Sequence, residues 1–178
     1  MMTTHFYTAS SLDGFIATKQ DSLEWLFAQH FDQQGPMSYE SFIDSIGALV
    51  MGRSTYQWLL KHQATWEYSQ PTWVFTHQQL PGIEGADIRL ISGDVEASFA
   101  DIQASAQGRD IWVMGGGDLA GQFADAGHLD ELWIQFAPVT LGSGKALLSR
   151  ELQLELLDAS RNEDFVCAHY RVLGELGA

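Results

Sequence analysis

Residues 111–136 read IWVMGGGDLAGQFADAGHLDELWIQF, and this stretch decides the fold. Its first four residues, Ile111 to Met114, are apolar without polar alternation, which is typical of a strand covered on both faces of a sheet. Three glycines follow, then a stretch from Asp118 to Ala126 that predicts a helix, and then an apolar run that ends at Phe136. The segment therefore predicts strand, glycine turn, helix and strand, the repeating unit of an α/β sheet.

The glycine triplet at positions 115–117 has two interpretations. Because glycines lack a Cβ, their N–H groups can lie against a bulky anion, at the point where the positive end of the next helix is directed. Alternatively they only form a tight turn, but two glycines usually suffice for that, so we favour a phosphate or pyrophosphate cradle. Residues 115–120 also satisfy the loose fingerprint GxGxxA, yet Asp130 and Glu131 begin the next strand rather than end it, which argues against a Rossmann domain.

A second turn of the same kind follows the short apolar strand Ala48 to Met51. There Gly52, Arg53, Ser54 and Thr55 open a helix that is expected to run to about Lys61. Arg offers a planar fork of donors to a phosphate, and Ser or Thr adds a short donor. The alternative, in which Ser54 or Thr55 only caps the helix beside a surface Arg53, is equally good for this segment alone.

The remaining pattern predicts strands at 5–9, 72–75 and 88–91, a helix at 38–46 ended by Gly47, and a helix after Asp94. Strand and helix alternate, so the sheet is expected to be mostly parallel. Strands at 152–158 and 166–172, joined by a polar turn at 160–164, predict an antiparallel hairpin at the end of the chain. Residues 142–145 look like the end of a P-loop, but Val139 and Ala146 break that motif, so the segment is predicted to be a loop.

The composition favours one domain over residues 1–178, without a linker or repeat. With 9 basic against 23 acidic residues, the net charge of −14 argues against nucleic acid or a membrane surface as partner. The first residues lack a signal-peptide pattern, and no apolar run reaches membrane-spanning length, so a cytoplasmic location is expected. Cys167 is the single cysteine, and the six histidines are scattered, so no metal site is expected.

Four segments together resemble the dihydrofolate reductase superfamily, on the side of the riboflavin-pathway pyrimidine reductase domain. They are residues 11–17, 51–56, 115–117 and 138–142, and they follow the order and spacing of that family over essentially the whole chain. The resemblance implies a three-layer αβα fold around a mixed, mostly parallel twisted sheet, with an antiparallel C-terminal hairpin. It also implies NADPH as cofactor.

The same resemblance implies roles for individual residues. Arg53 would approach the adenosine 2′-phosphate, Thr55 the pyrophosphate, and Thr76 and His77 the adenosine ribose-phosphate. The glycine triplet would pass the pyrophosphate, as its sequence alone also indicates. The full set of expected cofactor-binding residues is Gly52, Arg53, Ser54, Thr55, Thr76, His77, Gly115, Gly116, Gly117 and Leu119.

The substrate side matches the family less closely. Asp13 and Glu40 are the catalytic candidates, although Asp13 could simply form a turn, and Glu24 and Trp25 are the substrate-binding candidates. Phe15 stands where members that reduce a phosphoribosylaminopyrimidine tend to carry Lys, which puts a substrate phosphate in question.

Two functions are compatible with this pattern. The leading hypothesis is an NADPH-dependent reductase that transfers a hydride to a small pteridine- or pyrimidine-like substrate, resembling 5-amino-6-(5-phosphoribosylamino)uracil reductase and dihydrofolate reductase. The alternative is a nucleotide-binding module of the same fold without turnover. The chain is rich in Trp, Phe and Tyr, so we also expect a homodimer that uses part of the tail hairpin.

Overall fold

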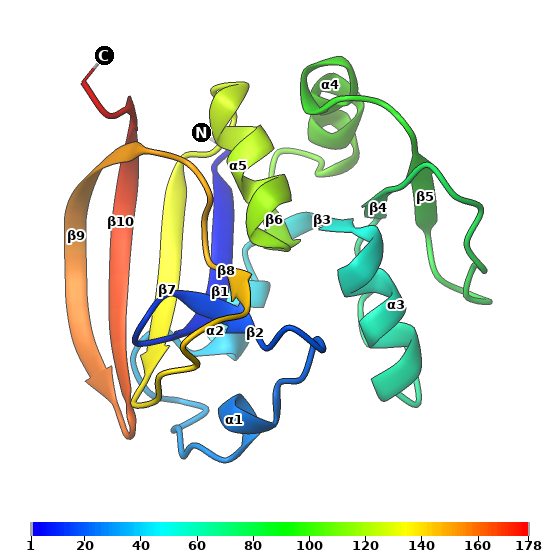
Figure 1. Ribbon diagram of the computed structural model, residues 1–178. Coiled ribbons are helices and arrows are strands. Elements are labelled where there is room, and N and C mark those ends of the chain that lie inside the picture. The colour runs from blue at the N-terminus through cyan, green and yellow to red at the C-terminus, as the bar shows by residue number, and fades with distance from the viewer. Residues whose placement is uncertain (1, 178) are drawn as a thin grey trace.

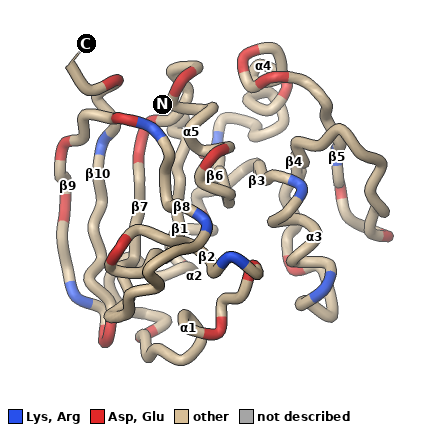
Figure 2. The backbone as a smooth tube through the Cα atoms, in the orientation of Figure 1, with Lys and Arg blue, Asp and Glu red and all other residues tan. Residues whose placement is uncertain are grey.

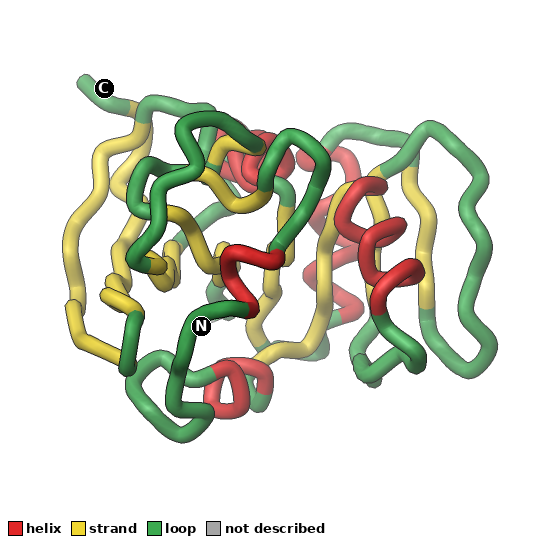
Figure 3. Tube along the Cα trace, turned by 60° about the horizontal axis from the view of Figure 1, so that its bottom comes forward, coloured by secondary structure: helices red, strands yellow, loops and turns green. Residues whose placement is uncertain are grey.

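The computed structural model describes residues 2–177 and is organised around an eight-stranded sheet with the order β5-β4-β3-β6-β1-β7-β10-β9 (Figure 1). The strands are β1 Thr4–Ser11, β3 Ile46–Gly52, β4 Thr72–Phe75, β5 Ile88–Ile91, β6 Asp110–Gly115, β7 Glu131–Ala137, β9 Leu152–Asn162 and β10 Phe165–Glu175. The strands from β5 to β7 pair in parallel, whereas β10 pairs antiparallel with both β7 and β9. The hairpin β9–β10 lies at the opposite end of the molecule from β5 (Figures 1 and 3).

Helices cover both faces of this sheet because successive strand residues point to opposite sides. Phe6 packs with residues of α4 and α5, while the next residue, Tyr7, packs with Phe42 of α2. Met51 packs in the same way with Tyr56 of α3. The helices are α1 Glu24–Phe27, α2 Tyr39–Ile43, α3 Arg53–His62, α4 Val95–Ser105 and α5 Gly117–Asp125. Among residues 2–177, no helix has the length and apolar content needed to cross a membrane.

The expected α/β fold, with a mostly parallel sheet and an antiparallel tail, is confirmed. Strands β4 and β5 begin and end at the predicted residues. Asp94 caps α4 as predicted, since its carboxylate accepts a hydrogen bond of 2.7 Å from the Ala97 N–H.

The prediction that Gly47 ends the preceding helix is wrong. Helix α2 ends at Ile43, and Gly47 lies inside β3. A Cβ at Gly47 would collide with the backbone carbonyl of Ala106, just beyond α4. Glycine therefore allows the helix end to approach the strand, and it does not terminate a helix.

The predicted turn at residues 160–164 is also wrong in its extent. Strand β9 continues to Asn162, and the turn consists of Glu163 and Asp164 alone. The polar side chain of Asn162 is buried, accepts from the Asp32 N–H at 2.7 Å and donates to the Pro36 carbonyl at 3.1 Å. A residue that reads as a turn former in the sequence thus fastens the hairpin to the loop before α2.

Two very short strands were not predicted, and one of them begins at the end of the predicted loop 142–145. Strands β2 Phe15–Ala17 and β8 Lys145–Ala146 form a separate two-stranded antiparallel sheet. Strands of two or three residues carry no detectable periodicity, so their pairing could not be read from the sequence.

The connections determine where a ligand can bind. From β3 the chain passes through α3 to β4, whereas from the neighbouring β6 it passes through α5 to β7, on the other side of β1. The two helices therefore begin at adjacent strand ends and leave toward opposite faces of the sheet. Such a reversal in an open α/β sheet leaves a crevice at the carboxyl ends of the strands.

Candidate functional site

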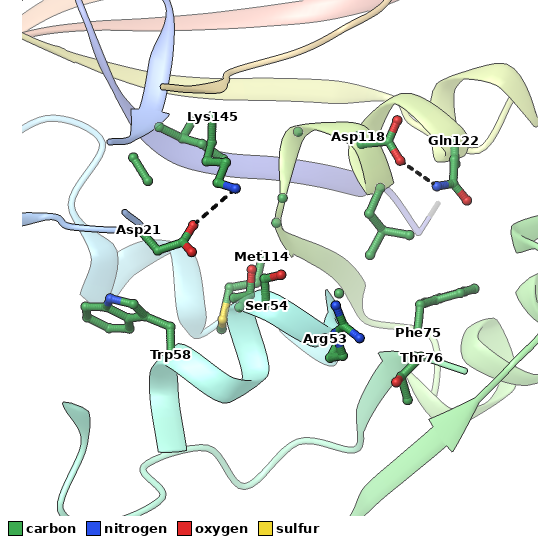
Figure 4. A pocket seen from close by; sticks show the side chains of 18 of the residues that line it. Asp21, Arg53, Ser54, Trp58, Phe75, Thr76, Met114, Asp118, Gln122 and Lys145 are labelled. Atoms are coloured by element: carbon green, nitrogen blue, oxygen red, sulfur yellow. Dashed lines mark hydrogen bonds and ion pairs between the residues drawn. The ribbon is translucent and has the colours of Figure 1, made fainter. Parts of the chain in front are cut away.

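A cavity of about 610 Å³ occupies this crevice (Figure 4). It extends from the carboxyl ends of β4 and β5, across the starts of α3 and α5, to the small sheet β2–β8. The volume lies within the usual range of roughly 300–1,000 Å³ for small-molecule sites. All the expected cofactor-binding residues line it: Gly52, Arg53, Ser54, Thr55, Thr76, His77, Gly115, Gly116, Gly117 and Leu119.

The three glycines of the β6–α5 turn differ in backbone conformation and in the space that a Cβ would find. Gly115 has φ +138°, a conformation that side chains rarely adopt, and its peptide bond to Gly116 is cis. At Gly117 a Cβ would collide with the carbonyl oxygens of Ala146 and Leu147 in the β8 segment. Gly116 has an ordinary φ of −77°, and a Cβ there would meet only Ile16 Cδ1, at 3.9 Å. The positive φ explains why position 115 requires glycine, and the close backbone contacts explain why position 117 does. Neither reason applies to position 116.

The β3–α3 turn presents a similar backbone surface. Gly52 is the N-cap of α3, with φ −82° and no side-chain capping bond, so the idea that Ser54 or Thr55 caps this helix is wrong. The Thr55 hydroxyl faces the Gly115 turn, 3.6 Å from the position of a Cβ there. Neither α3 nor α5 has a side-chain cap, so the first N–H groups of both helices remain available to a ligand.

Arg53 supplies a cation at this turn. Its side chain is exposed and lies between Ser54 and Thr76 in the cavity (Figure 4). Among residues 2–177 it forms no ion pair, in contrast to Arg89, Arg150 and Arg171. Since the chain is strongly acidic (Figure 2), an arginine without a carboxylate partner is well suited to an anionic ligand.

The ends of β4 and β5 form the far wall. Thr76 is buried, and its hydroxyl accepts from the Gln78 N–H at 3.0 Å, while the neighbouring His77 is exposed. Ile91 and Gly93 add a wall that the sequence analysis missed, because only the pairing of β5 beside β4 brings them there.

None of the four residues predicted for the substrate side lines the cavity. Glu24 and Glu40 are exposed on α1 and α2. Trp25 packs against Ala137 and Phe165 beneath β7 and β10. The structure therefore gives these three residues no place among the groups that could contact a ligand here.

Asp13 has a structural position instead. Its carboxylate accepts hydrogen bonds from the Ser11 hydroxyl at 2.7 Å, the Leu141 N–H at 3.0 Å and the Gly142 N–H at 2.7 Å. These bonds stabilise the ionised form and lower the pKa of Asp13 below its ordinary value. The residue thus joins the β1–β2 turn to the loop before β8.

Other residues line the end of the cavity that lies near the β2–β8 sheet. Ile16, Leu23, Trp58 and Met114 provide an apolar lining, and Asp21 and Lys145 provide charge. Trp58 could have been found from its spacing, because it follows Ser54 and Thr55 by four and three positions and so shares their helix face. Asp21 and Lys145 had no such signal, since they come from two segments that are distant in sequence.

Residues 53–168 match the model of the RibD C-terminal domain family. YwjB, an uncharacterized protein of Bacillus subtilis (strain 168), is 31% identical over 171 residues, which cover 94% of this chain and 96% of YwjB. A solved structure from Shewanella sp. PV-4, a protein assigned to riboflavin biosynthesis, has a TM-score of 0.83 at 25% identity over 96% of this chain and 99% of its own. A deaminase and 5-amino-6-(5-phosphoribosylamino)uracil reductase of Thermotoga maritima shares the fold, with a TM-score of 0.63 at 15% identity over 96% of this chain and 56% of its own.

The bonds around Asp13 lead to a prediction about stability. Because its pKa is lowered by folding, the ionised carboxylate stabilises the protein fully above the ordinary Asp pKa, and this contribution is lost as the pH falls through the lowered value. We expect Asp13→Asn to lower the melting temperature at pH 7, and the difference from wild type to shrink below about pH 4. Circular dichroism melts from pH 7 to pH 3 measure this, with Asp101→Asn, at an exposed position on α4, as control. An unchanged melting temperature at pH 7, or a difference that is constant with pH, would contradict the structural role.

Proposed function

Because the chain belongs to the RibD C-terminal domain family, we propose that it is an NADPH-dependent reductase that delivers a hydride to a small pteridine- or pyrimidine-like ring. One observation carries the proposal. Gly52 and Gly116 lie at two helix starts on one cavity, and at neither position does the backbone conformation or a neighbouring atom require glycine. The open space beside Gly116, together with the uncapped starts of α3 and α5, suits the phosphates of a dinucleotide that lies between the helices.

The donor set of the cavity fits this cofactor. The N–H groups at the start of α5 would hold the pyrophosphate, and Arg53 would contact the 2′-phosphate beside Thr76. Leu23, Trp58 and Met114 would surround the reacting rings and exclude water. NADPH, when bound, supplies the hydride, so the task of the chain is to bind and orient the two rings.

A nucleotide-binding module without turnover is the second candidate. It is favoured by one observation, namely that none of the predicted catalytic carboxylates lines the cavity. The two functions differ in a simple experiment with the purified protein. Enhanced NADPH fluorescence together with oxidation in the presence of a pterin or pyrimidine supports the reductase, whereas enhancement without oxidation across such a panel supports the binder.

The proposal includes the cytoplasmic location expected from the sequence. Cys167, the single cysteine, is buried and free, which is compatible with a reducing compartment.

The first prediction concerns the cradle. Gly116→Val should abolish NADPH binding while the protein remains folded, because the new side chain enters the proposed ligand space and its Cβ would meet only Ile16 Cδ1, at an ordinary contact distance of 3.9 Å. Fluorescence titration gives the affinity, and circular dichroism checks the fold. The matched control is Gly82→Val, at an exposed loop position outside the cavity where a Cβ would meet no atom within 4 Å. If folded Gly116→Val bound NADPH with the affinity of the wild type, the phosphate cradle at this turn would be refuted.

The second prediction concerns the choice between NADPH and NADH. If Arg53 contacts the 2′-phosphate, Arg53→Ala should weaken NADPH by about ten- to a hundred-fold and leave NADH nearly unchanged. Dissociation constants for both cofactors measure this, with Lys61→Ala near the end of α3 as control. Equal weakening of both cofactors would move Arg53 to the pyrophosphate, and no weakening would make it a surface arginine.

The third prediction concerns assembly. We propose a homodimer through the hairpin β9–β10, because β9 is an edge strand and Leu156, Val166 and Leu173 are 56–58% exposed there. Light scattering at micromolar concentration should give the mass of a dimer, and Val166→Asp should shift it toward a monomer. A monomeric wild type would refute this arrangement.

A further inference from the structure

The two basic side chains that line the cavity have different electrostatic surroundings. Arg53 has no carboxylate partner among residues 2–177, whereas the Lys145 ammonium lies 3.7 Å from the Asp21 carboxylate. Figure 4 shows this ion pair at the end of the cavity that also contains Trp58 and Met114. One end of the cavity is therefore ready for an anion, while the other presents a positive and a negative group side by side.

Close backbone contacts position Lys145. At Gly144 a Cβ would collide with the carbonyl oxygen of Ala17, and at Gly117 a Cβ would collide with the carbonyl oxygens of the β8 segment. Lys145 is paired with Ala17, and two residues later the Leu147 N–H donates to the Gly14 carbonyl at 2.8 Å. The lysine backbone is thus held between β2 and the start of α5.

A tight turn positions Asp21. Its N–H donates to the Thr18 carbonyl at 3.1 Å, and the Ser22 N–H donates to the Thr18 hydroxyl at 3.0 Å. Asp21 has φ +60°, in the left-handed region that Asp tolerates better than most residues. Both backbones are fixed, yet the two charged groups are about 1 Å farther apart than in a direct charge-assisted hydrogen bond of roughly 2.7–2.9 Å.

We infer that Asp21 and Lys145 together recognise a neutral planar ring with a carbonyl next to an N–H, such as the cis-amide edge of a pyrimidinone or pterin, and disfavour an anionic acceptor. This inference rests on the proposed function, since it concerns the hydride acceptor. Lys145 can only donate and ionised Asp21 can only accept, so the matching ligand edge has one acceptor beside one donor. Trp58 and Met114 provide the apolar surface for the ring.

The charge of the pair explains the discrimination. An anion that approaches Lys145 also approaches Asp21, so attraction and repulsion at similar distances largely cancel. A neutral amide edge gains one hydrogen bond from each group without that repulsion. Cofactor phosphates are therefore directed to Arg53, and an acceptor that places a phosphate at the pair is rejected.

Uracil and orotate, which is uracil with a carboxylate on the ring, test the inference by calorimetry without cofactor. Wild type should bind uracil more tightly than orotate. Asp21→Asn removes the repulsion and should shift the affinity ratio toward orotate by about ten-fold. Lys145→Gln should weaken both ligands. Lys19→Gln, an exposed lysine in the same loop that does not line the cavity, should behave as wild type.

The outcomes separate this inference from the proposed function, because NADPH binding is measured independently on the same proteins. A wild type that binds neither probe, or prefers orotate, overturns the inference, as does an unchanged ratio in folded Asp21→Asn. If NADPH binds but the ratio does not respond, the proposed cofactor site stands and the pair has no recognition role. If Asp21→Asn changes the ratio of the uracil and orotate affinities but NADPH does not bind, the recognition role of the pair is supported and the reductase proposal fails.

Discussion

Strands β3 and β6 pair in parallel at the centre of the sheet, with Leu49 opposite Trp112 and Val50 opposite Val113. Both strands are buried on both faces, so their register cannot slip without moving apolar side chains out of two cores. Each strand ends in a glycine and passes directly into a helix, α3 or α5. The pairing of two buried strands therefore places two uncapped helix starts side by side, and the cavity exists because of that register.

A second constraint closes the cavity. The β8 segment lies against the N-terminus of α5 at Gly117 and against β2 at Gly144, without side chains between the backbones. Asp13 holds the preceding loop through the Leu141 and Gly142 N–H groups. These contacts hold a glycine-containing loop in place as one wall of the cavity. A rigid wall favours specific recognition, because the polar groups that face a ligand must be held in place to form hydrogen bonds with one edge of it.

The cavity wall at the starts of α3 and α5 could be predicted because its signals are local. A strand, a glycine and a helix start are neighbours in the sequence, so Gly52 and Gly116 could be placed at the sheet edge before their surroundings were known. Local patterns failed where glycine served a distant contact, as at Gly47, which approaches Ala106. A local pattern also failed at Asn162. This residue was predicted to lie in a turn, but it lies in β9, where its side chain accepts a hydrogen bond from the loop at Asp32.

The end of the cavity near the β2–β8 sheet could not be predicted, because segments that are distant in sequence form it. Asp13 lies in the β1–β2 turn and Asp21 lies in the loop between β2 and α1, and of the two only Asp21 lines the cavity. The carboxylate of Asp13 accepts hydrogen bonds from backbone N–H groups, which gives it a structural role in holding the loop before β8. The two acids differ in position because β2 pairs with β8, and strands this short have no periodicity from which the pairing could be predicted.

Charge distribution links these two sides. In a chain with a net charge of −14, an isolated cation in a cavity attracts whichever anion is nearest, and that includes the protein's own carboxylates. Here Lys145 is already paired with Asp21, whereas Arg53 is left unpaired among the described residues. The proposed dinucleotide would place its phosphates toward Arg53, because the other end of the cavity already contains a carboxylate beside its lysine. The half-exposed Asp21–Lys145 pair therefore leaves that end of the cavity with little net attraction for an anion, in contrast to the end at Arg53.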